Sequence, residues 1–198
     1  MIIDSETYKL PKNNYHQSEY TKTQIVISDT TRKDMYHYDS WVNRGNGQCK
    51  KTAAYTIRKD GTIYEHYNPK YYSDFITLHD ISPFVIPIVL ENVGWLVKDE
   101  PNGRYYDWLG HSYMLDDVTN QKWRNKQTWD KYTNEQIISL KKLTDKLCDD
   151  FKIKNDCIGN TVFNEDVDIY EGITFRSNYY QEVTDINPAF DMITFNDL

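Results

Sequence analysis

One stretch of the sequence is patterned strongly enough to specify its own secondary structure, and it begins at Thr133. Thr133 and Gln136 match a capping box, in which each side chain accepts a backbone N–H that the start of a helix leaves unpaired. Behind them, apolar residues recur at three- and four-residue spacing; these are Ile137, Leu140, Leu143, Leu147 and Phe151. The pattern predicts a helix that ends near Phe151 and has one apolar face.

Two short apolar runs are typical of buried strands. Residues 24–28 (Q-I-V-I-S) are rich in β-branched side chains, and residues 84–90 (F-V-I-P-I-V-L) form a second run. Because Pro87 lacks a backbone N–H, we expect an edge or a bulge in the second strand. Residues 52–57 and 62–64 flank a Lys-Asp-Gly turn, which predicts a hairpin.

The remaining segments complete an alternating order of strands and helices. Residues 29–31 offer helix-capping side chains, so we expect a helix from there through about Trp41. Residues 94–130 are rich in Tyr, Trp, Asp and Gly with weak periodicity, which indicates a long surface excursion. The order strand, helix, hairpin, strand, helix predicts an α/β fold with a mixed central β-sheet covered by helices.

Length and charge limit the classes of protein that this chain can represent. A chain of 198 residues suffices for one well-buried domain, which we place at residues 23–198 behind an N-terminal arm, residues 1–22. A net charge of -7 argues against nucleic acid and anionic membranes as partners, because both require a basic face. The start of the chain resembles no secretory signal, so we expect synthesis in the cytoplasm, with any extracellular role depending on lysis or packaging in a particle.

Four segments together resemble one known family. They are residues 24–31 (Q-I-V-I-S-D-T-T), 53–65 (A-A-Y-T-I-R-K-D-G-T-I-Y-E), 85–96 (V-I-P-I-V-L-E-N-V-G-W-L) and 184–191 (T-D-I-N-P-A-F-D). Their order and spacing resemble those of the zinc-dependent N-acetylmuramoyl-L-alanine amidases, a family that also includes phage lysins and peptidoglycan recognition proteins. The resemblance implies the mixed α/β fold of that family and peptidoglycan fragments, or phage and host proteins, as partners.

Active members of that family hold zinc with two histidines and an aspartate or cysteine, and they surround the metal-bound water with a glutamate and often a lysine. Zinc accepts neutral imidazole and carboxylate in a tetrahedral set with one open position. The metal lowers the pKa of the bound water, which then attacks the amide while the other groups move protons and steady the oxyanion.

This sequence departs from the family pattern at most of those positions. Ser28 and Arg176 stand at the two histidine positions, and Val89 and Val183 stand at those of the glutamate and the lysine. Asp185 matches the ligand aspartate. A serine hydroxyl is a poor zinc ligand and a guanidinium repels the cation, so we expect no zinc and no amidase chemistry.

Loss of the metal would leave the Asp185 carboxylate without a partner, which is costly in a partly buried cleft. We therefore predict that Arg176 pairs with Asp185 and that Ser28 donates a further hydrogen bond. Asp29, His79 and Tyr55 are the residues that we expect to line the remaining cleft.

Two functions from different classes follow. The first is a pseudoenzyme that keeps its cleft for binding peptidoglycan, as a recognition module or as a component of a phage virion. The second is a working amidase with a rearranged metal site that uses Asp29, His79 or Asp185. The Tyr- and Trp-rich excursion could supply a sugar-stacking surface, a protein interface or simply core. The missing ligands and the missing glutamate favour the pseudoenzyme.

Overall fold

The computed structural model describes residues 1–77, 79–114 and 117–198. In this part of the chain, six strands form a central mixed sheet in the order β1-β4-β3-β5-β2-β11. They are β1 (Ile3–Asp4), β2 (Gln24–Asp29), β3 (Tyr55–Ile57), β4 (Ile63–Glu65), β5 (Val85–Leu90) and β11 (Gly172–Phe175). Strand β2 runs parallel to β5 and β11, and β3 is parallel to β5 and antiparallel to β4. The mixed α/β sheet predicted from the sequence is confirmed.

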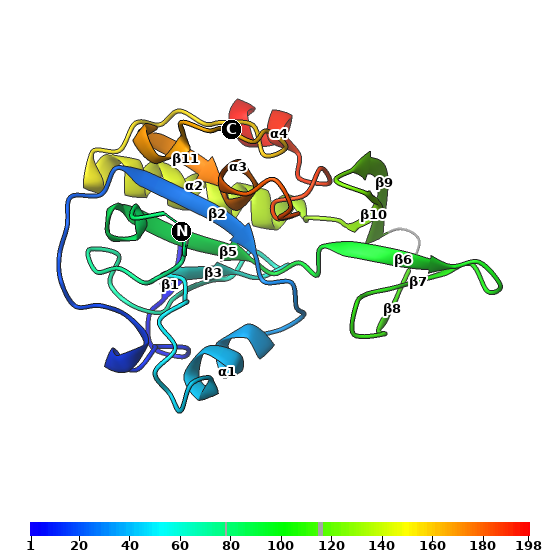
Figure 1. Ribbon diagram of the computed structural model, residues 1–198, viewed down its shortest axis with the longest axis horizontal. Coiled ribbons are helices and arrows are strands. Elements are labelled where there is room, and N and C mark those ends of the chain that lie inside the picture. Colours follow the sequence, from blue (N-terminus) through cyan, green and yellow to red (C-terminus); the bar gives the residue numbers. More distant parts are fainter. Residues whose placement is uncertain (78, 115–116) are drawn as a thin grey trace.

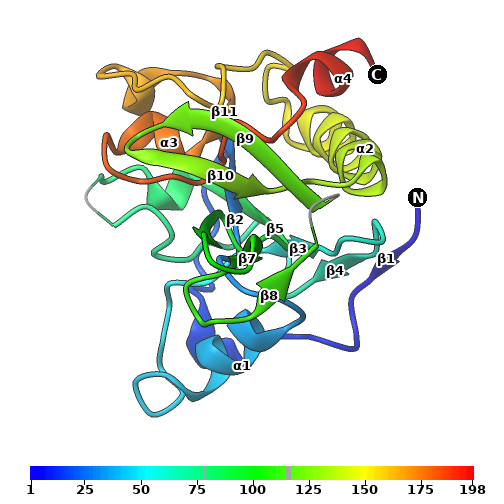
Figure 2. The ribbon, with the colours of Figure 1, turned by 90° about the vertical axis from the view of Figure 1, so that its right-hand side faces the viewer.

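Helices cover both faces of the central sheet, with α1 on one side and α2 on the other (Figures 1 and 2). Within the described ranges, the helices include α1 (Tyr36–Asn43), α2 (Asn134–Phe151), α3 (Arg176–Tyr179) and α4 (Met192–Asp197), and 3-10 turns cover Lys12–Asn14, Ser82–Phe84 and Val167–Ile169. Thr133 and Gln136 form the predicted capping box at the start of α2. Among the described residues, no helix combines the length and the apolar character that crossing a membrane requires.

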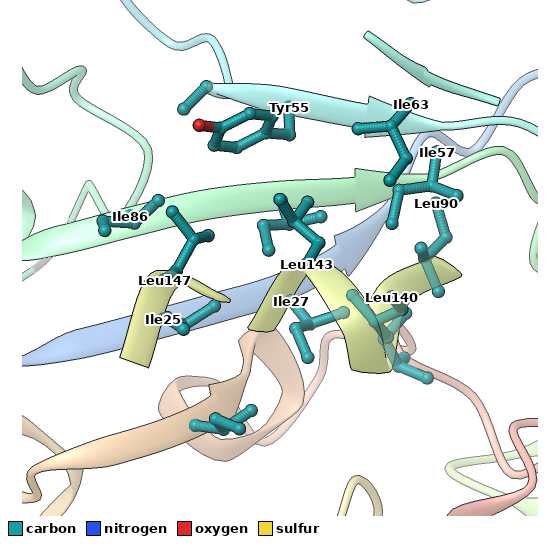
Figure 3. Close-up of a cluster of buried hydrophobic side chains, with 14 of the residues drawn as sticks. Ile25, Ile27, Tyr55, Ile57, Ile63, Ile86, Leu90, Leu140, Leu143 and Leu147 are labelled. Carbon is teal, nitrogen blue, oxygen red and sulfur yellow. The ribbon is translucent and has the colours of Figure 1, made fainter. Parts of the chain in front are cut away.

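The face of the sheet under α2 is the main hydrophobic core (Figure 3). Alternate residues of each strand point to this face, because side chains in a strand alternate between its two sides. Leu140, Leu143 and Leu147 of α2 pack against Ile25 and Ile27 of β2. The apolar face that the sequence predicted for this helix is therefore the face that packs against the sheet.

Pro87 lies in the interior of the sheet, so the expectation of an edge or a bulge is wrong. Its strand β5 pairs with β2 on one side and β3 on the other. The Pro87 carbonyl accepts the Ala54 N–H at 2.9 Å just before β3 begins, so the Pro87 nitrogen faces the same side, toward the carbonyl of Thr52. That carbonyl accepts the Ser73 hydroxyl at 2.6 Å instead. A side chain thus replaces the donor that proline lacks.

The helix expected after β2 begins later than the sequence suggested. Helix α1 starts at Tyr36, and the preceding loop places Thr31 and Asp34 at positive φ angles of 51° and 52°. Two carboxylates hold this loop: Asp29 accepts the Thr31 N–H at 3.0 Å and Glu91 accepts the Asp34 N–H at 2.8 Å. The Asp29 side chain, which we expected to cap a helix, therefore holds a loop instead.

Residues 94–130 contain a second sheet in place of the irregular surface excursion that we expected. In the described part of this segment, five strands pair antiparallel in the order β8-β7-β6-β10-β9. They are β6 (Trp95–Asp99), β7 (Arg104–Tyr106), β8 (Ser112–Tyr113), β9 (Val118–Trp123) and β10 (Lys126–Asp130). This sheet lies to the right of the central sheet in Figure 1 and faces the viewer in Figure 2.

The segment 1–22, expected as an arm, takes part in the domain. Strand β1 pairs parallel with β4 at one edge of the central sheet. Asn14 is fully buried, and its side-chain amide donates to the carbonyls of Trp41 and Cys49 at 3.0 and 2.9 Å. The segment therefore closes the sheet and supports the end of α1.

Candidate functional site

The candidate site lies at the edge of the central sheet where the parallel strands end. Open α/β sheets bind their ligands at the carboxyl ends of the strands, because the loops and helix starts that follow converge there. Ser28 and Asp29 end β2, and Arg176 follows directly after β11. Val89 of β5 lies beside Ser28 in the ladder. Residues that are far apart in the sequence thus meet at one edge.

Ser28, Arg176 and Asp185 form one contact cluster, as predicted. The Arg176 Nη1 atom lies 3.3 and 3.2 Å from the two Asp185 carboxylate oxygens, and the Ser28 hydroxyl donates to Asp185 Oδ2. Asp185 is only 4% exposed, so the guanidinium supplies the charge that its buried carboxylate requires. The nearby Asp185 carboxylate raises the pKa of Arg176 against the opposing effect of burial.

Asp29 is a second buried carboxyl group beside this cluster. Its Oδ1 accepts the Thr31 N–H at 3.0 Å and its Oδ2 accepts the Tyr132 hydroxyl at 3.3 Å. Burial raises the pKa of Asp29 well above its ordinary value, and the negative charge of Asp185 raises it further. The backbone N–H of Thr31 and the charge of Arg176 act in the opposite direction. The site thus combines a charge-paired carboxylate with a second carboxyl group whose pKa is raised.

Arg124 ties the second sheet to the loop that carries Asp185. It lies in the tight turn between β9 and β10, and its guanidinium donates to the carbonyls of Ser177 and Tyr180 at 2.8 and 2.7 Å and to the carbonyl of Val183. Sequence reasoning missed this residue. Arg124 has a φ of 43°, a conformation that no glycine or asparagine at this position signals in advance.

A cleft of about 300 Å³ opens beside Asp29, between the two sheets. Asp29, Thr31 and Thr184 contribute polar side chains to its lining, and Trp95 and Trp108 contribute indole rings from the second-sheet segment. The Trp108 Nε1–H donates to the Thr31 carbonyl at 2.8 Å, which fixes the ring against the loop after β2.

Both tryptophans of the cleft carry a cation against the ring. Lys126 Nζ lies 3.6 Å from the Trp95 ring centroid, and the Arg32 guanidinium carbon lies 5.3 Å from that of Trp108. Such cation–π contacts are favourable and hold a ring in place. The cleft therefore has two positioned aromatic walls and a polar floor.

Tyr55 and His79 do not reach this cleft. Tyr55 alternates with Ile57 along β3, so its ring points into the core under α2, where its hydroxyl donates to Glu65 at 2.9 Å (Figure 3). His79 contacts Asp168 at 2.8 Å, and these residues precede β5 and β11, toward the amino ends of those strands. The placement expected for these two residues is therefore wrong.

Val89 and Val183 supply no group that could move a proton. Val89 is 2% exposed and lies between Ser28 and Thr56 in the sheet. The hydroxyl of Thr56 bridges Nε2 of two buried histidines, His37 at 2.9 Å and His66 at 2.8 Å.

Burial lowers the pKa of His37 to about 3, helped by His66, and burial lowers the pKa of His66 to about 4. The His66 Nδ1 faces the carbonyl of Tyr8 at 2.7 Å, so a neutral His66 carries its proton there. Its Nε2 then accepts the Thr56 hydroxyl, and His37 donates from Nε2 to the same oxygen. This network fixes the tautomers of both rings.

The donor set at the sheet edge does not fit a zinc ion. Zinc takes neutral imidazole, thiolate or carboxylate, whereas the Asp185 carboxylate here is already paired with a permanent cation. Across residues 1–77, 79–114 and 117–198, no three His, Cys, Asp or Glu side chains are grouped so as to hold a metal ion. Asp29, a further carboxyl group that interacts with Asp185, is engaged by Thr31 and Tyr132.

Comparison with known proteins defines the family. Residues 18–170 match the family described as N-acetylmuramoyl-L-alanine amidase, which is more than half of the chain, so the chain belongs to that family. The matched range ends before Arg176 and Asp185. No curated protein matches the sequence significantly.

Solved structures show the same fold at low identity. The N-acetylmuramoyl-L-alanine amidase LysC from Clostridium intestinale URNW has a TM-score of 0.56 and 15% identity, with 100% of this chain and 96% of that chain covered. The Staphylococcus aureus hydrolase AmiA, in complex with its ligand, has a TM-score of 0.51 and 14% identity over 95% and 72%. The Ph2119 endolysin from the Thermus scotoductus MAT2119 bacteriophage has 0.50 and 13% over 94% and 90%.

Proposed function

We propose that this chain is a catalytically inactive member of the amidase family that binds cell-wall glycopeptide without cleaving it. The observation that carries the proposal is the contact of Arg176 and Ser28 with Asp185. An amidase of this family needs an open metal position at its carboxylate ligand, and here a guanidinium occupies that side of the carboxylate. Binding of a glycopeptide needs only a cleft, and one opens beside Asp29.

Elemental analysis of the purified protein tests the inactive state directly. We expect no stoichiometric zinc, and we expect purified sacculi to release no stem peptides during prolonged incubation with the protein. An active member of the family run in parallel is the control for the substrate. Zinc near one equivalent, or a release of stem peptides that a chelator abolishes, would overturn the proposal and establish an amidase with a rearranged metal site.

Restoring the family's ligands tests whether these three positions form its metal site. The double substitution Ser28→His and Arg176→His places two imidazoles beside the Asp185 carboxylate. We expect this variant to take up about one equivalent of zinc. The matched control carries His at Ser28 and at the exposed Arg104 instead, and we expect it to remain free of zinc.

Co-sedimentation with sacculi tests the binding half of the proposal. We expect the wild-type protein to pellet with intact sacculi and to stay in the supernatant without them. Protein that remains soluble in both cases would contradict glycopeptide binding. It would favour an assembly role in a phage particle, with phage or host proteins as partners; the structural likeness to a phage endolysin is the observation that supports such a context.

A further inference from the structure

A second pocket, of about 310 Å³, lies at the opposite end of the parallel strands from the candidate site. It is lined by Asp74 and by residues of the loop after α1, residues 44–51 (R-G-N-G-Q-C-K-K). This loop precedes β3 and Asp74 precedes β5, and the arrow of β5 points toward the second sheet in Figure 1. The pocket therefore lies toward the amino ends of these strands, whereas Ser28 and Arg176 lie at carboxyl ends.

Asn14 fixes the shape of this loop. Its fully buried side-chain amide donates to the carbonyls of Gly47 and Cys49 at 3.4 and 2.9 Å. Residues 45–47 have φ angles of 63°, 54° and 77°, a left-handed conformation that glycine and asparagine adopt most readily. The Cys49 carbonyl faces Asn14, so the Lys50 N–H of the same trans peptide points away from it. The tight turn brings the cations at the two ends of the loop to one pocket.

Positive charge is in excess in this pocket. Three cationic side chains line it: Arg44, Lys50 and Lys51. In the part of the chain that the structure describes, Arg44 and Lys51 form no ion pair, although the protein has a net charge of -7. Asp74 is the one carboxylate of the lining, and it accepts a hydrogen bond from His16 Nε2 at 2.9 Å. Lys50 Nζ donates to His16 Nδ1 at 3.4 Å, which leaves the proton of a neutral ring on Nε2.

We infer that this pocket binds the phosphoryl group of a small phosphate monoester. A phosphate monoester carries nearly two negative charges at pH 7 and has three terminal oxygens, which match three cations around one hollow. The Arg44 guanidinium can donate to two of these oxygens in parallel, and Lys50 and Lys51 act as point charges. A volume of about 310 Å³ is at the small end of ligand sites, which suits a phosphoryl group with a small organic remainder.

Calorimetric titration of the full chain with glycerol 3-phosphate tests the inference, with acetate and dimethyl phosphate compared at equal ionic strength. We expect glycerol 3-phosphate to bind at millimolar concentration or below. Acetate and dimethyl phosphate each carry a single charge and should bind about ten-fold more weakly. No binding of glycerol 3-phosphate at millimolar concentration, or equal affinity for the three anions, would overturn the inference.

A pair of double variants assigns the binding to this loop. Arg44→Gln with Lys51→Gln should weaken glycerol 3-phosphate by about ten-fold or more, because charged hydrogen bonds are lost. Arg104→Gln with Lys142→Gln is the matched control, since it changes the net charge equally at two exposed positions outside the pocket. Circular dichroism checks that both double variants keep the fold. An equal loss of affinity in both would mean long-range attraction by net charge, which would overturn the inference.

Amide NMR of isotope-labelled protein shows where the ligand binds. We expect glycerol 3-phosphate to shift the backbone signals of residues 44–51 and to leave the indole signal of Trp108, in the cleft beside Asp29, unchanged. Shifts centred on that cleft, or spread over lysines across the surface, would overturn the inference. The inference does not depend on glycopeptide binding, because the pocket and the cleft share no lining residue.

Discussion

Strands β5 and β6 follow one another with only residues 91–94 between them, yet they have opposite surroundings. Every residue of β5 is buried, whereas in β6 only Leu96 is buried and Val97 is 53% exposed. Strand β5 lies between two parallel neighbours under helices, which is why its sequence is almost continuously apolar. Strand β6 belongs to a thin antiparallel sheet with a small apolar cluster of its own.

The second sheet therefore depends on tethers to the central domain. Asp130 of β10 accepts the Val93 N–H at 3.0 Å and pairs with Lys59 at 2.8 Å, and Arg124 binds the loop before Asp185. Sparse apolar packing makes such a region less stable and more adaptable than a core. The central sheet supplies the fixed charge cluster of the site, and the second sheet supplies the aromatic wall of the cleft.

Acidification should produce the largest loss of stability. The loss should come from His37 and His66, which both contact Thr56 of the central sheet. The pKa values of His37 and His66, about 3 and about 4, lie below their ordinary 6.5, so between those limits the unfolded chain binds more protons. Stability therefore falls as the pH falls through this window. From pH 7 to pH 5 the two groups together should remove about 4 kcal/mol from the free energy of unfolding.

Urea denaturation at both pH values measures this loss against the double variant His37→Gln and His66→Gln. The wild type should lose about 4 kcal/mol more than the variant between pH 7 and pH 5. Asp29, whose raised pKa acts in the opposite sense, is present in both proteins and cancels. The same pH dependence in both proteins would mean that the histidines titrate freely.

Replacing Arg176 by alanine should cost about 3 kcal/mol of stability at pH 7, because it leaves the buried Asp185 carboxylate unpaired. Arg104→Ala, at an exposed position of the second sheet, is the control and should have little effect. Adding Asp185→Asn to Arg176→Ala should recover part of the loss, because it removes the stranded charge. A loss that Asp185→Asn leaves unchanged would assign the effect to packing instead.

Arg124→Ala tests the tether between the two sheets and should cost about 2 kcal/mol, since charged hydrogen bonds to three carbonyls are lost. The neighbouring exposed Lys122→Ala is the matched control. Hydrogen exchange should accelerate in residues 177–185 and in β9 and β10 for Arg124→Ala alone. Faster exchange confined to the second sheet would show that the loop before Asp185 holds its position without this residue.

The central sheet was predictable because its patterns are local. The capping box at Thr133, the apolar runs of β2 and β5 and the Asp-Gly hairpin each predict one element from neighbouring residues. The contact of Arg176 with Asp185 followed from the family resemblance, since no local pattern places the first residue of α3 beside a residue of the loop that follows. Whether these residues mark a lost zinc site stays a prediction.

The second sheet escaped prediction because its strands are short and half exposed, so neither strict alternation nor continuous apolar character appears. Tyr55 was misplaced although alternation was informative there: it shares a strand face with Ile57, and both are buried under α2. His79 required knowledge of where Asp168 lies, which only the tertiary fold provides.

The same substitution made once in each sheet compares the packing of the two sheets, and its member in the second sheet should have the smallest effect of the series. Val89→Ala removes two methyl groups at a position that is 2% exposed and should cost about 2 kcal/mol, because the transfer energy and the cavity both count. Val97→Ala, at 53% exposure, should change stability by less than about 0.5 kcal/mol. Thermal and urea denaturation give both values. Equal losses would mean that another surface covers Val97 in solution, such as a second copy of the chain, and a dependence of the Val97→Ala effect on protein concentration would then identify that contact.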